Sequence, residues 1–380
     1  QRRIDLLAIE QTAWALAARD LRCKVVATRT ELDWAMKNDQ ICVWAPSKIV
    51  LDAVDGPSAG PRDALALAMW FAREMQAKEV FVIGTDAPAS DLPVVAHPLD
   101  RLAAPRAPIA GLPLTAPRIM GILNVTPDSF SDGGLFNDPD AACAHALDMV
   151  QAGADIIDIG GESTRPGART VGHADEIART APVIAAIRAR SDIPISIDTR
   201  KSDVARAALT AGASFINDVA AMTYDPAMAQ TAATSGAPIC LMHASGDPAT
   251  MQNDPTYDNV LLDIYDFLAT QIRSATASGI HPDRIIVDPG IGFGKTLDHN
   301  LTLLRGLSLF HGLGCAVLLG ASRKRFIGTL ANAPRARDRT AGSVAVALHG
   351  VTQGVQILRV HDTVETRQAL RLQMAMAEQL

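Results

Sequence analysis

The sequence predicts an α/β protein in which a (β/α)8 barrel, a TIM barrel, spans residues 118–380 and follows a small α/β N-terminal domain. Two patterns predict the barrel. From residue 118 onward, short β-branched and other apolar runs alternate eight times with longer, Ala-rich segments of helical period, as in successive βα units. A polar residue also stands where each of the eight runs ends. The 263 residues involved (380 − 118 + 1) match the usual size of this barrel, about 250 residues.

Each expected strand is one of these apolar runs. In chain order the strands cover residues 119–124, 154–161, 193–198, 214–219, 237–243, 284–289, 316–322 and 355–361. The helices expected between and after them cover residues 139–152, 173–190, 202–211, 225–235, 258–278, 298–312, 340–353 and 363–378. Glycines at 153, 212, 236 and 279 mark helix ends, where a left-handed residue is needed.

The polar strand ends favour a barrel over a doubly wound sheet, which would produce the same alternation. Each residue alone would be interpreted as a cap or a turn residue. In a barrel, however, strand ends converge on the face where active sites of this fold lie, so a polar residue at every end indicates a site. These residues are Asn124, Glu162, Asp198, Asn217, His243, Asp288, Ser322, Arg359 and His361.

The N-terminal part of the chain follows a different pattern. Residues 1–100 contain apolar runs at 24–28, 41–46 and 79–84 and a helical stretch at 63–76, which predict a small accessory α/β domain of unknown role. Residues 101–117 carry four prolines, at 105, 108, 113 and 117, and are interpreted as an extended linker.

Composition restricts the classes of partner. Lys and Arg number 35 and Asp and Glu 41, a formal net charge of −6, which gives no general attraction to nucleic acid or to an anionic membrane. No apolar run approaches the roughly 20 residues of a membrane helix. The five cysteines are scattered and show no zinc-site spacing, so a reducing cytoplasm is the expected compartment. The expected partners are small molecules.

Two polar loops follow the first two strands. The segment GILNVTPDSFSDGG at 121–134 has Asn124 at a strand end and a loop suited to close over a charged substrate. In DIGGESTRPG at 158–167, Thr164 and Arg165 can offer a hydroxyl and a guanidinium to an anion. An ordinary surface connection and a solvated arginine are the alternatives.

Two segments place carboxylates at strand ends. In SIDTRKSDVA at 196–205, Asp198 ends an apolar strand, although it could instead support a cap of the next helix. The segment IIVDPGIGFGKT at 285–296 resembles a phosphate-binding GxxxxGK[ST] loop, but Pro289 stands where the first glycine is required. We therefore reject a nucleotide-binding loop. Asp288 is instead suited to accept from a guanidine-like edge.

Cations dominate the last two segments. In LLGASRKRFIG at 318–328, Arg323, Lys324 and Arg325 follow a strand and begin a helix, a position that favours anions. In ILRVHDT at 357–363, Arg359 and His361 share one side of the last strand, as expected for a pyrophosphate site. A solvated basic run and a structural histidine are the alternatives.

Taken together, LNVTPDSFSDGG, DIGGESTRPG, DPGIGFGK and SRK, in this order, resemble the dihydropteroate synthase family over essentially all of residues 118–380. The resemblance implies a transferase of folate synthesis that joins 6-hydroxymethyl-7,8-dihydropterin pyrophosphate to p-aminobenzoate. It also implies a homodimer and Mg²⁺ as cofactor.

The resemblance assigns roles to residues. Asp198, Asn217, Asp288 and Lys324 would bind the pterin, while Arg359, His361 and Asn124 would hold the pyrophosphate, with Mg²⁺ at Asn124. Thr164, Arg165 and Pro166 would lie in a closing loop, and p-aminobenzoate would sit near Pro166 and Phe293. The residues expected to act in catalysis are Lys324, Asp198, Arg359 and His361.

Three positions depart from the family pattern. Ala244 stands where a Met is common, Ser245 replaces a larger polar residue, and Arg325 stands where some members have Ser. A pterin-binding methyltransferase barrel and a catalytically silent pterin-binding protein are the rival interpretations. The STRPG, SRK and RVH segments argue against the first, because a methyltransferase need not hold pyrophosphate, and the two intact loops argue against the second.

Overall fold

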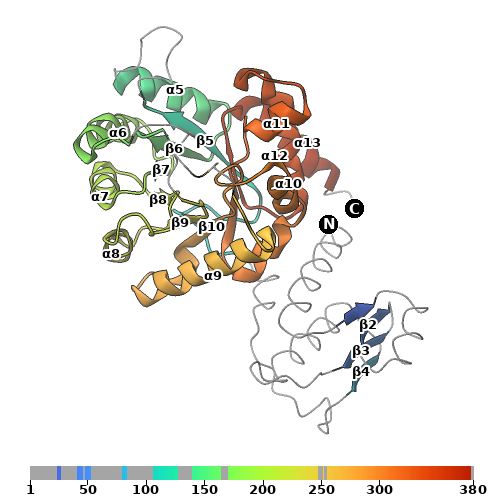
Figure 1. Cartoon of the computed structure of the whole chain (residues 1–380). Coiled ribbons are helices and arrows are strands. Elements are labelled where there is room, and N and C mark those ends of the chain that lie inside the picture. The colour runs from blue at the N-terminus through green and yellow to red at the C-terminus, as the bar shows by residue number, and fades with distance from the viewer. Residues whose placement is uncertain are drawn as a thin grey trace. The chain divides into compact units, whose positions relative to one another are not determined.

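The computed structural model describes the four strands of an N-terminal sheet and residues 106–126, 139–163, 170–246, 251 and 255–377 (Figure 1). The chain divides into two units between Ala104 and Pro105. Each unit is described by itself.

The N-terminal unit contains a four-stranded sheet in the order β1-β2-β3-β4. The apolar runs at 24–28, 41–46 and 79–84 contain the strands β1 (Lys24–Val26), β2 (Ile41–Ala45) and β4 (Glu79–Ile83). The strand β3 (Lys48–Asp52) was not predicted from the sequence. It pairs antiparallel with β2 and parallel with β4. The helix predicted at 63–76 lies outside the described residues.

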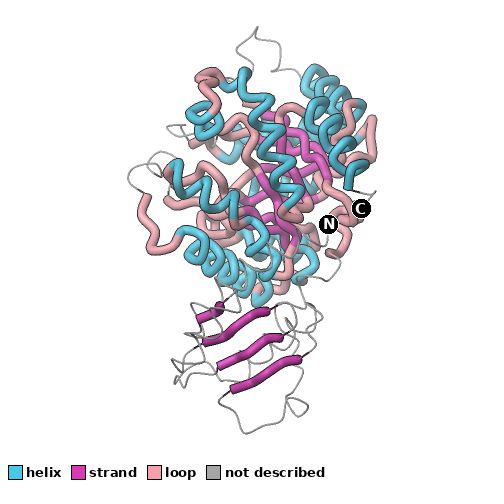
Figure 2. Tube along the Cα trace, turned by 90° about the vertical axis from the view of Figure 1, so that its right-hand side faces the viewer, coloured by secondary structure: helices cyan, strands magenta, loops and turns pink. Residues whose placement is uncertain are grey.

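The second unit is a closed barrel of eight parallel strands, which confirms the predicted fold class. Its strands lie at the centre, enclosed by helices (Figure 2). The last strand pairs with the first, since Ile357 lies in register with Arg118. The strands are β5 (Arg118–Asn124), β6 (Ile156–Gly160), β7 (Ile195–Asp198), β8 (Phe215–Asp218), β9 (Ile239–Met242), β10 (Ile285–Asp288), β11 (Ala316–Leu319) and β12 (Ile357–Val360).

All eight expected helices are present, at nearly the expected bounds. They are α5 (Pro139–Gln151), α6 (His173–Arg188), α7 (Ser202–Ala211), α8 (Met228–Ser235), α9 (Val260–Ala277), α10 (Leu297–Arg305), α12 (Thr340–Thr352) and α13 (Thr363–Ala377). A short α11 (Arg325–Leu330) follows β11. Gly212 and Gly236 end α7 and α8 with φ of 112° and 68°, as the glycine pattern predicted.

Two helix bounds differ from the prediction. The helix expected at 298–312 ends at Arg305 and continues as a 3-10 helix, η4 (Leu307–Leu313). At the junction, Gly306 packs closely against Leu261, since a Cβ added to it would lie 2.7 Å from a methyl carbon of that side chain. The helix α8 begins three residues later than expected, and Asp225, the first residue of the expected helix, accepts from Ser202 N at the start of α7 at 2.7 Å.

The barrel interior is closed at its amino-terminal end by residues that the sequence assigned to a linker. Ile109 and Leu114 are buried in one cluster with Met120, Phe215 and other apolar residues of the barrel strands. Ile109 and Leu112 also form a backbone bridge. The linker predicted over 101–117 is therefore too long, because from Pro105 the chain is part of the barrel unit.

Candidate active site

Along several strands, the interior side chains of the barrel change from apolar to polar. Successive interior residues are two apart, so Phe215 is followed by Asn217, Ile286 by Asp288, and Ile357 by Arg359. The amino-terminal half is filled and apolar, whereas the carboxyl-terminal half carries charged and amide groups. This arrangement gathers charged and amide groups at the face where the strand-end pattern predicted a site.

The interior polar groups form one connected set around Arg359. Its Nε donates to Asp158 Oδ2 at 2.6 Å and its Nη2 to Asp198 Oδ2 at 2.7 Å. Asn217 Nδ2 donates to Asp158 Oδ1 and Oδ2 at 3.4 and 3.3 Å. We call Asp158, Asp198, Asn217, Asp288, Lys324 and Arg359 the strand-end cluster. Carboxylates of the neighbouring strands β6 and β7 thus share one guanidinium, which comes from the distant strand β12.

Asp198 is held in a state that favours an incoming donor. It is 7% exposed, and its Oδ1 is buried with no hydrogen-bond partner among the described residues. Burial raises the pKa of Asp198 to about 7, although Arg359 opposes the rise and Asp158 adds to it. Burial works against the charge of Arg359, but Asp158 and Asp198 together raise the pKa of its guanidinium above the ordinary value. Asp198 can therefore accept from, or donate to, a ligand near neutral pH.

Asp288 and Lys324 form the other side of the cluster. Gly290 N donates to Asp288 Oδ1 at 2.7 Å, and burial raises the pKa of this carboxyl. Lys324 Nζ donates to the carbonyl of Ile291 and lies 4.1 Å from the centre of the Phe293 ring. Burial lowers the pKa of Lys324 to about 7, against the opposing charge of Asp288. Lys324 can therefore change charge near neutral pH.

The glycines of the GIGFG loop permit this close assembly. A Cβ on Gly290 would lie 1.8 Å from the carbonyl oxygen of His243, and one on Gly292 would lie 2.9 Å from Cδ of Lys324. Both glycines have positive φ, 69° and 82°, a backbone conformation that residues with a side chain rarely adopt. The loop therefore serves to bring Phe293 and Lys324 together.

The lysine of the same segment, Lys295, is buried and contacts neighbouring residues of the protein. Lys295 is 4% exposed, donates to the Phe293 carbonyl at 2.8 Å, and lies 3.0 Å from His243 Nδ1. Burial, and to a smaller extent the charge of Lys295, lowers the pKa of His243 to about 3. The ammonium of Lys295 is thus engaged within the protein, in agreement with our rejection of a nucleotide-binding loop.

The remaining predicted residues lie at the same end of the barrel where they are described. His361 N donates to Ser322 Oγ at 3.2 Å, and His361 Nδ1 lies 3.1 Å from the same oxygen. A Cβ added to Gly160 would lie 3.6 Å both from Asn124 Oδ1 and from Asp198 Oδ2, so these two oxygens flank Gly160. Thr164, Arg165 and Pro166 lie outside the described residues.

Sequence reasoning missed several charged residues that the structure brings together. Asp158 is fully buried within the cluster, but it lies in the middle of β6, so the strand-end pattern does not mark it. Lys201 ion-pairs with Glu162 and Glu176, and Arg200 Nη2 donates to Glu162 Oε1 at 2.9 Å. No local pattern marks this second network, because it depends on contacts between β6, α6 and the start of α7.

The three positions that depart from the family pattern lie after β9 and at the start of α11. Ala244 and Ser245 follow β9 and are half-buried, and a Cβ on Gly294 would lie 2.5 Å from that of Ser245. Arg325 is exposed and is the first residue of α11.

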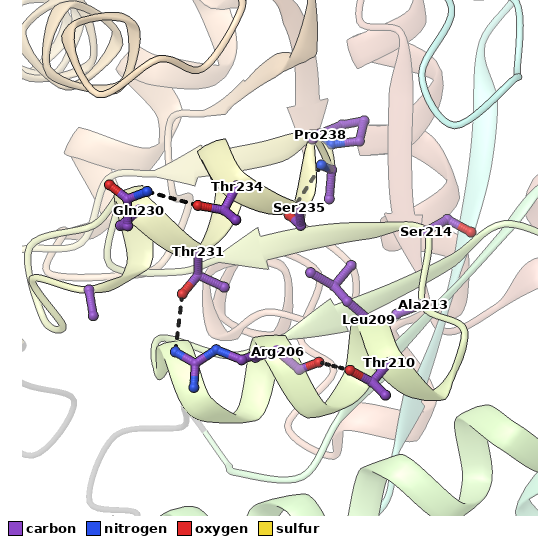
Figure 3. Close-up of a pocket in the computed structure, with 13 residues that line it drawn as sticks. Arg206, Leu209, Thr210, Ala213, Ser214, Gln230, Thr231, Thr234, Ser235 and Pro238 are labelled. Atoms are coloured by element: carbon purple, nitrogen blue, oxygen red, sulfur yellow. Dashed lines mark hydrogen bonds between the residues drawn. The ribbon is translucent and has the colours of Figure 1, made fainter.

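A separate groove of about 690 Å³ lies on the outside of the barrel between α7 and α8 (Figure 3). Its lining includes Arg206, Thr210, Thr231 and Pro238, and Arg206 Nη2 donates to Thr231 Oγ1 at 3.5 Å. None of the cluster residues contributes to it. The groove is a feature distinct from the strand-end site.

Comparison with known proteins agrees with this geometry. A family described as pterin binding enzyme matches residues 120–361. This is well over half of the chain, so the chain is a member of the pterin-binding barrel enzymes. Dihydropteroate synthases of Synechocystis sp. and Escherichia coli K12 are 49% and 46% identical to it over 244 and 261 residues, which are 64% and 69% of this chain and 84% and 92% of theirs.

Solved structures give the same result. A Yersinia pestis dihydropteroate synthase in complex with a sulfonamide drug has a TM-score of 0.69 and 44% identity, and the match covers 72% of this chain and all of that one (100%). A Xanthomonas albilineans dihydropteroate synthase in complex with 7,8-dihydropteroate has a TM-score of 0.65 and 41% identity, over 72% of this chain and 99% of that one. The chain belongs to the dihydropteroate synthases, transferases of folate synthesis.

Proposed function

We propose that the strand-end cluster binds 6-hydroxymethyl-7,8-dihydropterin pyrophosphate and joins it to p-aminobenzoate, giving 7,8-dihydropteroate and pyrophosphate. The observation that carries this proposal is the pair of buried carboxylates, Asp198 and Asp288, that face one interior with Lys324 and Arg359. Buried carboxylates need donors, and the amine and ring N–H groups of a pterin supply them.

In the proposed complex, each side chain has a distinct contact. Asp198 Oδ1, which has no partner among the described residues, accepts from a ring N–H group. Asp288 accepts a hydrogen bond from the 2-amino edge, and Asn217 forms a hydrogen bond with the ring. The ammonium of Lys324 reaches the ring carbonyl. These contacts fix the pterin methylene relative to the mouth of the barrel, and orientation of this kind lowers the entropic part of the barrier.

The chemistry requires an anion site more than a nucleophilic side chain. The C–O bond at the methylene breaks and its electron pair leaves with pyrophosphate, while the arylamine nitrogen forms the new C–N bond and then loses a proton to solvent or to the departing anion. Arg359 and His361 stabilise the negative charge that develops on the leaving group. A guanidinium has five N–H donors, so Arg359 can hold its two carboxylates and an anion together.

The second substrate is proposed to bind beside Phe293. The closing loop that carries Thr164, Arg165 and Pro166 would cover it and exclude water from the cationic methylene. The arylamine is neutral at pH 7 and can attack without a strong base. This accounts for a site without a Ser/His/Asp arrangement among its described residues.

Mg²⁺ is part of the proposal. Asn124 offers an amide oxygen beside Asp198, and Mg²⁺ prefers a few protein oxygens together with substrate phosphates and water. The described residues contain no cluster of three His, Cys, Asp or Glu side chains that could hold a metal, so the oxygens of pyrophosphate would complete the site. When bound, the ion would neutralise charge on the leaving group.

A homodimer and a cytoplasmic location stay predictions of the sequence. Among the described residues, no helix is long and apolar enough to cross a membrane.

The function is tested with the purified full chain, pterin pyrophosphate, p-aminobenzoate and Mg²⁺. We expect pyrophosphate release that depends on the arylamine, that stops when the metal is chelated, and that resumes when Mg²⁺ is added. Release without the arylamine, or no release at all, would contradict the proposal. The rival interpretation, a pterin-binding methyltransferase, predicts no release of pyrophosphate under these conditions.

A further inference from the structure

Lys324 of the cluster follows a residue with an unusual backbone conformation. Arg323 has φ of 57°, in the left-handed region, and it is not glycine. Such a conformation is strained for a residue with a side chain and persists only when its surroundings hold it. Because Arg323 immediately precedes Lys324, its backbone sets the direction in which the chain presents Lys324.

Both the backbone and the guanidinium of Arg323 are held by residues from other segments. Its guanidinium is ion-paired with Asp362, and its Nε lies 3.1 Å from Asp362 Oδ2. Its backbone N–H donates to Ser343 Oγ at 2.8 Å, and its carbonyl accepts from Arg339 Nη1 at 2.9 Å. This set of contacts encloses the turn between β11 and α11.

Asp362 is the centre of this enclosure. It is 5% exposed, and Thr340 Oγ1 also donates to its Oδ1 at 3.0 Å. Burial tends to raise the pKa of Asp362, but the hydrogen bond and charge of Arg323 hold it below the ordinary value. The carboxylate is therefore ionised, and a charge-assisted pair of this kind is stronger than a neutral hydrogen bond.

The turn is anchored on both sides of Arg323. Ser322 contacts His361, the residue before Asp362. Lys324 contacts the Ile291 carbonyl and the Phe293 ring. The loop after β12 thus holds the first two residues of the Ser322–Lys324 segment, and the third reaches the loop after β10.

We propose that Asp362 is a positioning residue, whose ion pair with Arg323 stabilises the left-handed turn that presents Lys324 to the substrate. This inference rests on the proposed function, because it assigns Lys324 to the pterin. Asp362 itself touches no substrate in this scheme.

The test compares Asp362→Asn, Arg323→Ala and Arg323→Gly in the full chain. The matched control is Asp203→Asn, since Asp203 forms an exposed pair with Arg206 at 2.9 Å on α7. For each variant, kcat and KM for pterin pyrophosphate are measured at saturating p-aminobenzoate. The Kd for pterin pyrophosphate, from quenching of ligand fluorescence, and the melting temperature are measured in parallel.

We expect Asp362→Asn and Arg323→Ala to lose at least about tenfold in kcat/KM for the pterin substrate, with weaker binding, because a charge-assisted contact is removed. Asp203→Asn should stay within about twofold, as is usual for an exposed ion pair. Arg323→Gly should recover at least about threefold over Arg323→Ala, because glycine adopts positive φ without strain.

Three results would overturn the proposal: activity of Asp362→Asn within about twofold of the parent chain, no recovery by glycine, or a lowered melting temperature with unchanged Kd and KM. A parent chain that binds pterin pyrophosphate but does not turn over would contradict the proposed function instead. In that case the ratio of Kd values alone would decide the role of Asp362.

Discussion

Replacing Asp198 with Asn is expected to abolish most activity while making the barrel less sensitive to alkaline pH. Burial raises the pKa of Asp198 from 3.8 to about 7 in the folded chain. Between these values the folded state binds more protons than the unfolded state, so the contribution of this group to stability falls as pH rises. Above pH 7 the loss is complete and constant.

The size of the effect follows from the same shift. Each pH unit in this window corresponds to about 1.4 kcal/mol, so two units between pH 5 and pH 7 give an upper limit of roughly 3 kcal/mol. The amide that Asp198→Asn introduces cannot ionise. The decrease in unfolding free energy between pH 5 and pH 8 should therefore be smaller in the variant by about 1–3 kcal/mol.

The assay is urea unfolding followed by far-UV circular dichroism at pH 5 and pH 8. Tryptophan fluorescence is unsuitable for the barrel, because all four tryptophans lie at or before residue 70. Asp203→Asn is the control, since the pKa of Asp203 is lowered, first by its hydrogen bond with His173, and this group does not titrate between pH 5 and pH 8.

Activity is measured on the same samples. The Asp198→Asn variant should lose at least about 100-fold in kcat/KM, because an amide cannot supply a charge-assisted contact in a water-poor site. An unchanged pH dependence of stability would refute the reasoning about the buried carboxylate. Near-normal activity would refute its place in the site.

Four further substitutions test other parts of the molecule. Lys324→Ala should lower kcat/KM at least about 100-fold in the pyrophosphate-release assay, because it removes a charged contact to the pterin. Lys201→Met should lower the unfolding free energy in urea by about 3–5 kcal/mol, since it leaves the buried carboxylate of Glu176 without its ion-pair partner; a loss below about 1 kcal/mol would show that the network is not energetically coupled. Ile109→Ala should lower the free energy of unfolding by about 2–4 kcal/mol and leave kcat unchanged; a variant with an unchanged free energy of unfolding would contradict the place of Ile109 in the core. Arg165→Ala should raise KM for p-aminobenzoate more than for the pterin substrate, and equal effects would argue against its role in the closing loop.

The fold could be predicted from the sequence wherever the local pattern and the tertiary contacts agree. The eight apolar runs became strands because their alternation with helices leaves few other arrangements. The prediction failed where a distant contact decided the outcome. The helix expected at 298–312 is divided at Gly306, which packs against Leu261 of α9, and Ile109 from a proline-rich segment packs into the amino-terminal end of the barrel.

The site divides in the same way. Asp198, Asn217, Asp288 and Arg359 could be predicted because polar residues at strand ends have few structural uses in a parallel barrel. Asp158 could not be found by that rule, because it lies inside its strand and its role depends on Arg359 from the opposite end of the barrel sequence. The αL conformation of Arg323 leaves no trace in the sequence, since arginine rarely adopts it.

The most direct test of the account is a crystal structure of the full chain with 7,8-dihydropteroate. We expect the pterin ring to contact Asp198, Asn217 and Asp288, with the ammonium of Lys324 beside the ring carbonyl. A ring bound elsewhere, such as the groove between α7 and α8, or a ring at the strand ends that contacts neither Asp198 nor Asp288, would contradict it.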